Sequence, residues 1–199
     1  AKFHEDLAYP TSKLIGSKHS EVVIMNGLTV NLHLLLISFY KPTKNRNKIL
    51  IEKGSFPSDQ YAIESQIKFH GYDPKECLIE IEPREGEFCI HTKDILRIIQ
   101  QQGPKIETII LGGVNYYTGQ LMDMKNITKY GKMIGAKVGF DLAHAIGNVD
   151  LYLHKWNVDF AVWCSYKYLC AGPGAPGGVF INEAYHNWCG PRLEGWWGH

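Results

Sequence analysis

The feature that most constrains the fold of this chain is a regular alternation of short apolar runs and helical segments. Apolar runs of strand length occur at 48–52, 77–81, 108–111, 137–141, 158–163 and 178–182. Helices are expected between successive runs, at 57–70, 91–102, 127–134 and 149–156. Strands that alternate with helices of this length predict an α/β fold with a mostly parallel, doubly wound sheet covered on both faces.

The N-terminal part of the chain is expected to be helical on both sides of a turn. Residues 11–24 mix charged and apolar side chains at roughly helical spacing, and a buried helix is expected from about Leu28, after a turn at Asn26-Gly27. A Gly-x-Thr pattern at a helix start, here ending at Thr29, offers backbone N–H groups, a hydroxyl and the positive end of the helix dipole to a phosphate. Taken alone, the pattern is better explained as a simple helix cap.

Length and composition favour one domain and exclude several classes of partner. The 199 residues, 45% of them hydrophobic, suffice for one sizeable core. Lys and Arg number 21 against 20 Asp and Glu, with no basic stripe, so neither nucleic acid nor an anionic membrane is expected as a partner. No apolar run reaches membrane-spanning length. The five scattered cysteines lack a C-x-x-C pair, which favours reduced thiols and a cytoplasmic location over disulfides or a zinc site.

Side chains capable of chemistry follow several of the predicted strands. Lys167 comes just after the run 158–163, and Asp141 ends the run 137–141 with His144 shortly behind it. Because the loops after parallel strands converge at one sheet edge, these side chains are expected to meet there. Loops at the same edge carry Phe56, Ser58, Asp59, Tyr116 and Tyr117.

Each of these residues alone has an ordinary explanation, but the set favours a cofactor site. Lys167 alone is an ordinary surface lysine, Asp141 a helix N-cap and His144 a satisfied core histidine. Together they supply what pyridoxal 5′-phosphate requires. A desolvated lysine forms a Schiff base, a carboxylate keeps the pyridine nitrogen protonated, an aromatic ring stacks on the cofactor and N–H or O–H donors hold the phosphate.

Four sequence blocks resemble the kynureninase family. The blocks are Phe56-Pro57-Ser58-Asp59, Tyr117-Thr118-Gly119-Gln120, the run 139–145 (GFDLAHA) and the run 163–169 (WCSYKYL). The family consists of pyridoxal-phosphate hydrolases of the class V aminotransferase group with the type I aminotransferase fold. The resemblance, which runs from about Thr11 to His199, implies a cytoplasmic homodimer in tryptophan catabolism and NAD biosynthesis. The implied reaction cleaves L-kynurenine or 3-hydroxy-L-kynurenine to anthranilate or 3-hydroxyanthranilate plus L-alanine.

The resemblance also implies roles for individual residues. Lys167 is the Schiff-base lysine, Asp141 pairs with the pyridine nitrogen, and Tyr117 is a candidate acid or base. Phe56 is expected to stack on the cofactor ring, and Trp196 to reach the phosphate across a dimer interface. The full set of expected cofactor contacts is Leu28, Thr29, Phe56, Pro57, Ser58, Asp59, Gly112, Asp141, His144, Tyr166, Lys167 and Trp196.

Departures from the family pattern leave two alternatives open. Gly112 stands where relatives often carry a serine, and Cys170 stands where an asparagine is frequent. The arginine that binds the substrate carboxylate belongs to the family's small C-terminal domain, so residues 1–199 are expected to be an incomplete cofactor-binding large domain. The alternatives are another class V enzyme such as a cysteine desulfurase, although no cysteine has an obvious claim to be its nucleophile, and a non-catalytic truncated domain.

Overall fold

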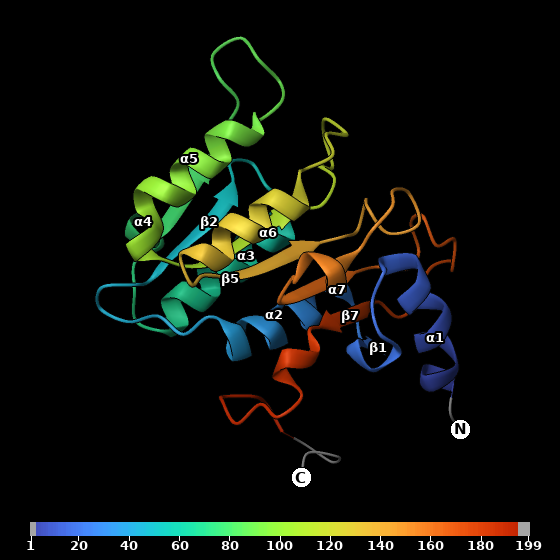
Figure 1. The fold of residues 1–199 in the computed structure, drawn as a ribbon. Helices are drawn as coiled ribbons and strands as arrows, with labels where there is room; N and C mark the ends of the chain where they lie inside the picture. Colours follow the sequence, from blue (N-terminus) through green and yellow to red (C-terminus); the bar gives the residue numbers. More distant parts are fainter. Residues whose placement is uncertain (1–2, 195–199) are drawn as a thin grey trace.

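A seven-stranded sheet forms the centre of the computed structural model, which describes residues 3–194 (Figure 1). The strands are β1 (Val22–Ile24), β2 (Lys48–Glu52), β3 (Leu78–Ile81), β4 (Ile106–Gly112), β5 (Lys137–Asp141), β6 (Phe160–Trp163) and β7 (Gly178–Ile181). Their order across the sheet is β1-β7-β6-β5-β4-β2-β3. The five strands from β3 to β6 in this order are parallel, and β7 and β1 are each antiparallel to their neighbours. The predicted mostly parallel sheet is confirmed.

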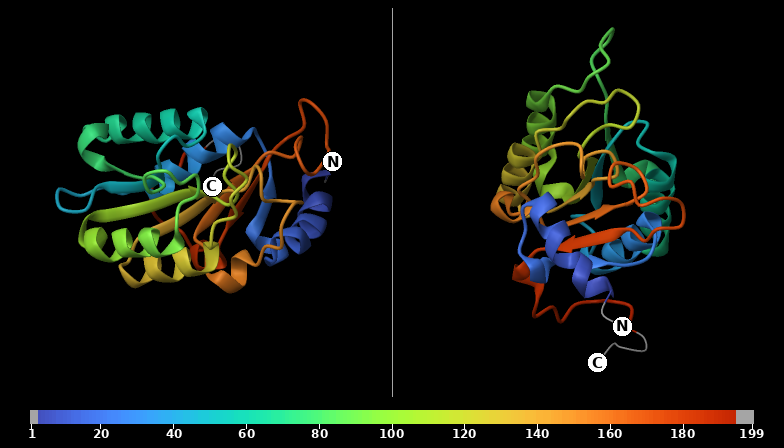
Figure 2. Two further views of the ribbon diagram at one scale, coloured as in Figure 1. Left: turned by 90° about the horizontal axis from the view of Figure 1, so that it is seen from above. Right: turned by 90° about the vertical axis from the view of Figure 1, so that its right-hand side faces the viewer.

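Helices cover both faces of the sheet (Figure 2). They are α1 (Phe3–Ile15), α2 (Leu28–Phe39), α3 (Pro57–Phe69), α4 (Pro74–Cys77), α5 (Thr92–Gln102), α6 (Met124–Met133) and α7 (Leu153–Trp156). One apolar cluster joins α1, α5, α6 and α7 to the sheet, and a second joins α2 and α3 to its other face. In β4, Ile109 and Leu111 belong to the first cluster and Ile110 to the second, as the two-residue period of a strand requires. The sheet is therefore buried between two helical layers.

The N-terminal part differs from the prediction. The expected helical character of residues 11–24 is wrong beyond Ile15, because α1 ends there and β1 pairs with β7. Gly16, with φ of +59°, makes the left-handed turn that ends the helix, and the β-branched run 22–24 then continues as an extended strand. The short helix α4 was not predicted. Helix α6 begins at Met124, three residues before the predicted start, because the Asp123 side chain caps it.

Register between the parallel strands brings their carboxyl ends together. Gly112 at the end of β4 pairs with Asp141 at the end of β5, which pairs with Val162 in β6. Glu52 ends β2, the neighbour of β4 on its other side. The loops that follow these four strands therefore start side by side. Within the described part of the chain, no helix combines the length and the apolar character needed to cross a lipid bilayer.

Candidate functional site

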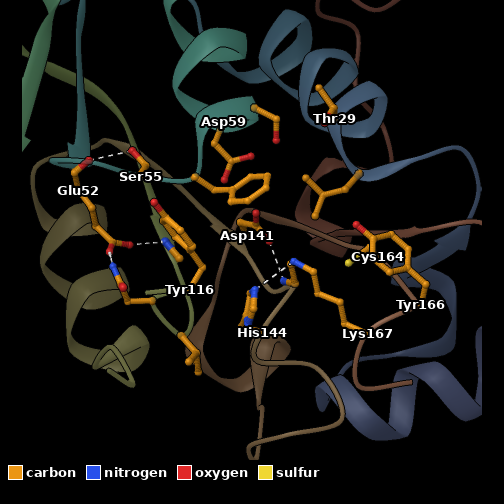
Figure 3. A pocket seen from close by; sticks show the side chains of 17 residues that line it. Thr29, Glu52, Ser55, Asp59, Tyr116, Asp141, His144, Cys164, Tyr166 and Lys167 are labelled. Atoms are coloured by element: carbon orange, nitrogen blue, oxygen red, sulfur yellow. Dashed lines mark hydrogen bonds between the residues drawn. The ribbon is translucent and has the colours of Figure 1, made fainter. Parts of the chain in front are cut away.

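A cavity of about 260 Å³ lies at the carboxyl edge of the sheet (Figure 3). This is near the lower end of the volumes usual for small-molecule sites. Ten expected cofactor contacts line it: Leu28, Thr29, Phe56, Ser58, Asp59, Gly112, Asp141, His144, Tyr166 and Lys167. Pro57 begins α3 beside the cavity without lining it. Trp196 lies outside the described residues.

Lys167 and His144 form the polar centre of the pocket. Lys167 Nζ is 3.0 Å from His144 Nε2 and 5.4 Å from the centroid of the Phe56 ring. Burial, followed by the charge of Lys167, lowers the pKa of His144, so the ring is neutral at pH 7 and can accept a hydrogen bond from the ammonium. His144 is placed by a turn after β5, in which Asp141 Oδ1 accepts a hydrogen bond of 2.6 Å from the Ala143 N–H.

Two aspartates lie close together in the pocket with raised pKa values. Asp141 ends β5, and Asp59 lies in the first turn of α3, which Pro57 starts. Burial is the largest cause of the raised pKa of both carboxyls, and the neighbouring Asp141 adds to the shift that raises the pKa of Asp59 to about 9. Asp59 Oδ1 is buried and has no hydrogen-bond partner among the described residues. With its raised pKa, Asp59 keeps a proton that it can share with Asp141, while its Oδ1 accepts no hydrogen bond from the described chain.

The start of α2 and Tyr166 form another wall of the pocket. Gly27 is the N-cap of α2 and has no side chain that could cap the helix. Leu28 and Thr29, the next two residues, line the cavity. The start of this 12-residue helix thus presents backbone N–H groups and the positive end of its dipole. Tyr166 lies beside Cys164, whose thiol raises the pKa of the Tyr166 hydroxyl. This wall suits an anionic group.

The two tyrosines of the loop after β4 have different surroundings. Tyr116 lines the cavity, and its ring meets that of Phe56 edge-on, at 5.3 Å between centroids and 84° between planes. Tyr117 is 83% exposed and lies in a neighbouring hollow beside Phe88. The structure thus does not bring Tyr117 into the pocket, and its expected role as an acid or base stays a prediction.

Sequence reasoning missed several polar residues of the pocket, and two of them interact with each other. Glu52 and Asn115 both line it, and Asn115 Nδ2 donates a 2.6 Å hydrogen bond to Glu52 Oε2. One signal was available for Glu52, because it is the charged last residue of a strand with an apolar centre, and that strand ends where ligands bind. Asn115 had the weaker signal of a turn-forming residue between Gly113 and Gly119.

Curated relatives resemble the chain along nearly all of its length. The kynureninase of Flavobacterium psychrophilum is 56% identical over 198 residues, which is 99% of this chain and 47% of that protein. The kynureninase of Homo sapiens is 53% identical over 186 residues, or 94% of this chain and 40% of that protein. The chain thus spans about half the length of the curated relatives it matches. The expected resemblance to kynureninases is confirmed.

Solved structures share the fold at low sequence identity. A cysteine desulfurase from Thermococcus onnurineus superposes with a TM-score of 0.77 at 21% identity, covering 92% of this chain and 44% of that one. A lysine-to-alanine mutant of C-DES, with glycine covalently linked to its PLP cofactor, gives a TM-score of 0.79 at 16% identity, covering 98% and 49%. The family model for class V aminotransferases matches residues 4–188. With this match and the fold in agreement, the chain belongs to the class V aminotransferase family.

Proposed function

We propose that this chain is the cofactor-binding large domain of a pyridoxal-phosphate-dependent kynureninase. The complete protein would hydrolyse L-kynurenine or 3-hydroxy-L-kynurenine to anthranilate or 3-hydroxyanthranilate plus L-alanine. The observation that carries the proposal is the convergence of three separate blocks that resemble the kynureninase family, at 56–59, 139–145 and 163–169, on one pocket around Lys167. The similarity of nearly the whole chain to kynureninases supports the choice of substrate.

The residues present fit pyridoxal phosphate. Asp59 Oδ1 is a buried polar atom without a partner in the described chain, and Lys167 offers a primary amine in the same cavity. The uncapped start of α2 at Leu28 and Thr29 matches a phosphate. When bound, the cofactor supplies an electron sink for the carbanion that bond cleavage leaves.

The chain's own residues then have separate roles in the proposed reaction. Lys167 would hold the cofactor through its aldehyde, and its amine would carry the substrate's α-proton. The neutral His144 ring, 3.0 Å away, accepts a hydrogen bond from the lysine and limits its orientations. Asp141 holds a proton at the pyridine nitrogen, and Phe56 stacks on the ring. Tyr117 is our choice for proton transfer at the substrate carbonyl.

The remaining contacts concern the phosphate and the ring edge. Thr29 and Tyr166 supply hydroxyl groups toward the phosphate, and Leu28 supplies its backbone N–H. Ser58 and Asp59 follow Pro57 in the first turn of α3 and would lie near the cofactor ring. Gly112, at the end of β4, offers no hydroxyl where a serine would. Trp196 is proposed to reach the phosphate from a second subunit.

The proposal extends to the organisation of the whole protein. Residues 1–199 form the large domain, and a smaller C-terminal domain supplies the arginine that binds the substrate carboxylate. Two such chains form a cytoplasmic homodimer. The support for this arrangement is that the matched relatives are about twice as long as this chain.

The experiment compares the whole protein with the 199-residue chain. Each is mixed with pyridoxal phosphate and its visible absorbance recorded, then L-kynurenine, 3-hydroxy-L-kynurenine or cysteine is added. Fluorescent anthranilate is expected from the whole protein, with little or none from the short chain. Sulfide from cysteine without anthranilate from kynurenine would instead favour the desulfurase alternative. Full activity of the short chain would show that the substrate-binding residues are misplaced.

A further inference from the structure

We propose that Glu52 is a positioning residue of this site. It orients the side chain of Asn115 and thereby fixes the turn that presents Tyr116 at the pocket. The inference deepens the proposed function and rests on it, because it concerns how the same pocket is held in shape for its reaction.

The first step concerns the Glu52 carboxylate, which is buried and accepts a hydrogen bond through each of its oxygens. Glu52 ends β2 and is only 3% exposed. Its Oε1 accepts a 2.7 Å hydrogen bond from the Gly112 N–H, and its Oε2 accepts a 2.6 Å bond from Asn115 Nδ2 (Figure 3). Burial is the main reason that the pKa of Glu52 is raised, and these two bonds oppose the shift. One side chain thus ties the end of β2 to the end of β4 and to the loop beyond.

The second step is the orientation of the Asn115 amide. Asn115 Oδ1 accepts hydrogen bonds of 2.9 Å from the N–H groups of both Tyr117 and Thr118, and a 3.1 Å bond from the Thr118 hydroxyl. Rotating the amide by half a turn would place its NH₂ group against these two N–H donors. Glu52 accepts only from the NH₂ end, so its carboxylate selects the orientation that closes the turn.

The third step links the turn to the pocket. Tyr116 lies in the turn, and its ring packs against that of Phe56 in a T-shaped contact. Phe56 in turn faces Lys167 Nζ at 5.4 Å. A turn that loses the Asn115 side-chain bonds no longer holds the backbone after Tyr116 and so loosens one wall of the pocket. Loss of orientation at a reacting centre costs rate even when the ligand still binds.

A charge swap in the whole protein tests the inference. Glu52→Gln brings its own NH₂ against that of Asn115, and Asn115→Asp brings two carboxylates together in a buried place. The double variant Glu52→Gln with Asn115→Asp restores a donor facing an acceptor and keeps an acceptor for Gly112, Tyr117 and Thr118. Each single change is expected to lower kcat for L-kynurenine about tenfold, and the double change to return it to within about threefold of wild type.

The second readout does not depend on turnover. Hydrogen exchange of the Tyr117 and Thr118 amides, measured in the whole protein without cofactor, is expected to accelerate in both single variants and to recover in the double variant. The visible absorbance of bound cofactor per subunit should stay at the wild-type level, so that the loss falls on kcat. The control is Glu80→Gln, an exposed carboxylate on the adjacent strand β3, which should change neither kcat nor exchange.

The outcomes separate the two proposals. A double variant about a hundredfold slower than wild type, the sum of two independent losses, would overturn the role of Glu52, and so would unchanged amide exchange in Glu52→Gln. If a single variant fails to fold, the double variant decides, because folded protein with slow turnover and fast exchange contradicts the inference. Wild-type protein that leaves kynurenine intact would instead reject the proposed function, while amide exchange would still test Glu52.

Discussion

Buried aspartates occur at both ends of the parallel strands, and their surroundings differ. At the edge where parallel strands begin, Asp159 is 0% exposed and accepts hydrogen bonds from the Lys132 ammonium, the Tyr185 hydroxyl and the Val138 N–H. At the edge where these strands end, Asp141 and Asp59 lie together, and one oxygen of Asp59 has no partner in the described chain. At the first site both carboxylate oxygens accept hydrogen bonds, whereas at the second the two carboxyls face each other and Asp59 Oδ1 accepts none from the described chain.

The difference separates a structural carboxylate from a functional one. Satisfied buried carboxylates hold a fold together, and removal of one partner leaves a buried charge uncompensated. Carboxylates whose pKa values are raised by burial and by each other are typical of ligand sites. The comparison predicts that changes at the Asp159 edge alter stability, and changes at the Asp141 edge alter binding and turnover.

The largest effect is expected from Lys167→Ala. Reduction of the cofactor-loaded protein with borohydride should fix the cofactor on Lys167, as mass spectrometry of peptides would show. The variant should lose this label entirely and lose turnover by a factor on the order of 10³ or more, because it lacks the amine that binds the aldehyde. Lys53→Ala, which removes an exposed lysine paired with Glu82, serves as the control. A label on any other lysine in wild-type protein would contradict the assignment.

Asp159→Asn should give the next largest effect, and only on stability. It leaves the Lys132 ammonium without its buried counter-charge, at a cost of about 3–5 kcal/mol in the free energy of unfolding. Urea unfolding of the whole protein measures the loss, and Glu82→Gln in an exposed ion pair should show almost none. Folded Asp159→Asn protein should turn over substrate at the wild-type rate. A slow but stable variant would remove the distinction between the two edges.

Asp141→Asn should lower turnover and leave the free energy of unfolding largely unchanged. The amide keeps an acceptor for the Ala143 N–H but cannot hold a negative charge at the pyridine nitrogen. Cofactor should still bind, while kcat falls by a factor on the order of 10², or about 3 kcal/mol in activation free energy. Steady-state kinetics with saturating cofactor measure it. Unchanged turnover would leave Asp141 only the structural role of holding the turn before His144.

The smallest effect, on the pH dependence of stability, is expected from Asp59→Asn. The pKa of Asp59 rises from 3.8 to about 9 in the folded protein. Between these values the unfolded chain has released a proton that the folded chain still holds, so stability falls as pH rises and is greatest below the lower value. The slope is about 1 kcal/mol per pH unit around neutrality.

Asp59→Asn should remove this slope in the cofactor-free whole protein. Urea unfolding at about pH 6 and about pH 7 measures it, with the exposed helix cap Asp73→Asn as the control. Equal slopes in wild type and Asp59→Asn would show that Asp59 ionises normally, and the contrast with Asp159 would then rest on hydrogen bonds alone.

Much of this fold follows from sequence because local and global preferences agree. The runs at 48–52 and 137–141 match β2 and β5, and the carboxyl ends of these strands place Asp141 where it was expected. The 22–24 strand was missed because its partner β7 lies far along the chain, and pairing at that distance leaves no local signal. Glu52 and Asn115 were missed for a related reason, since their mutual hydrogen bond depends on the register of β2 with β4.

The pairing of β1 with β7 also has a consequence for how the protein is made. Val22 pairs with Phe180, so nearly the whole domain must leave the ribosome before the first strand has a partner. Until then β1 has no neighbour in the sheet, while the parallel strands made between β1 and β7 can already assemble. Closing so long a loop slows folding, and apolar surface and an unpaired strand stay exposed until it has closed. The strand β1, although it is made before the rest of the sheet, is thus the last of the seven strands to find its place.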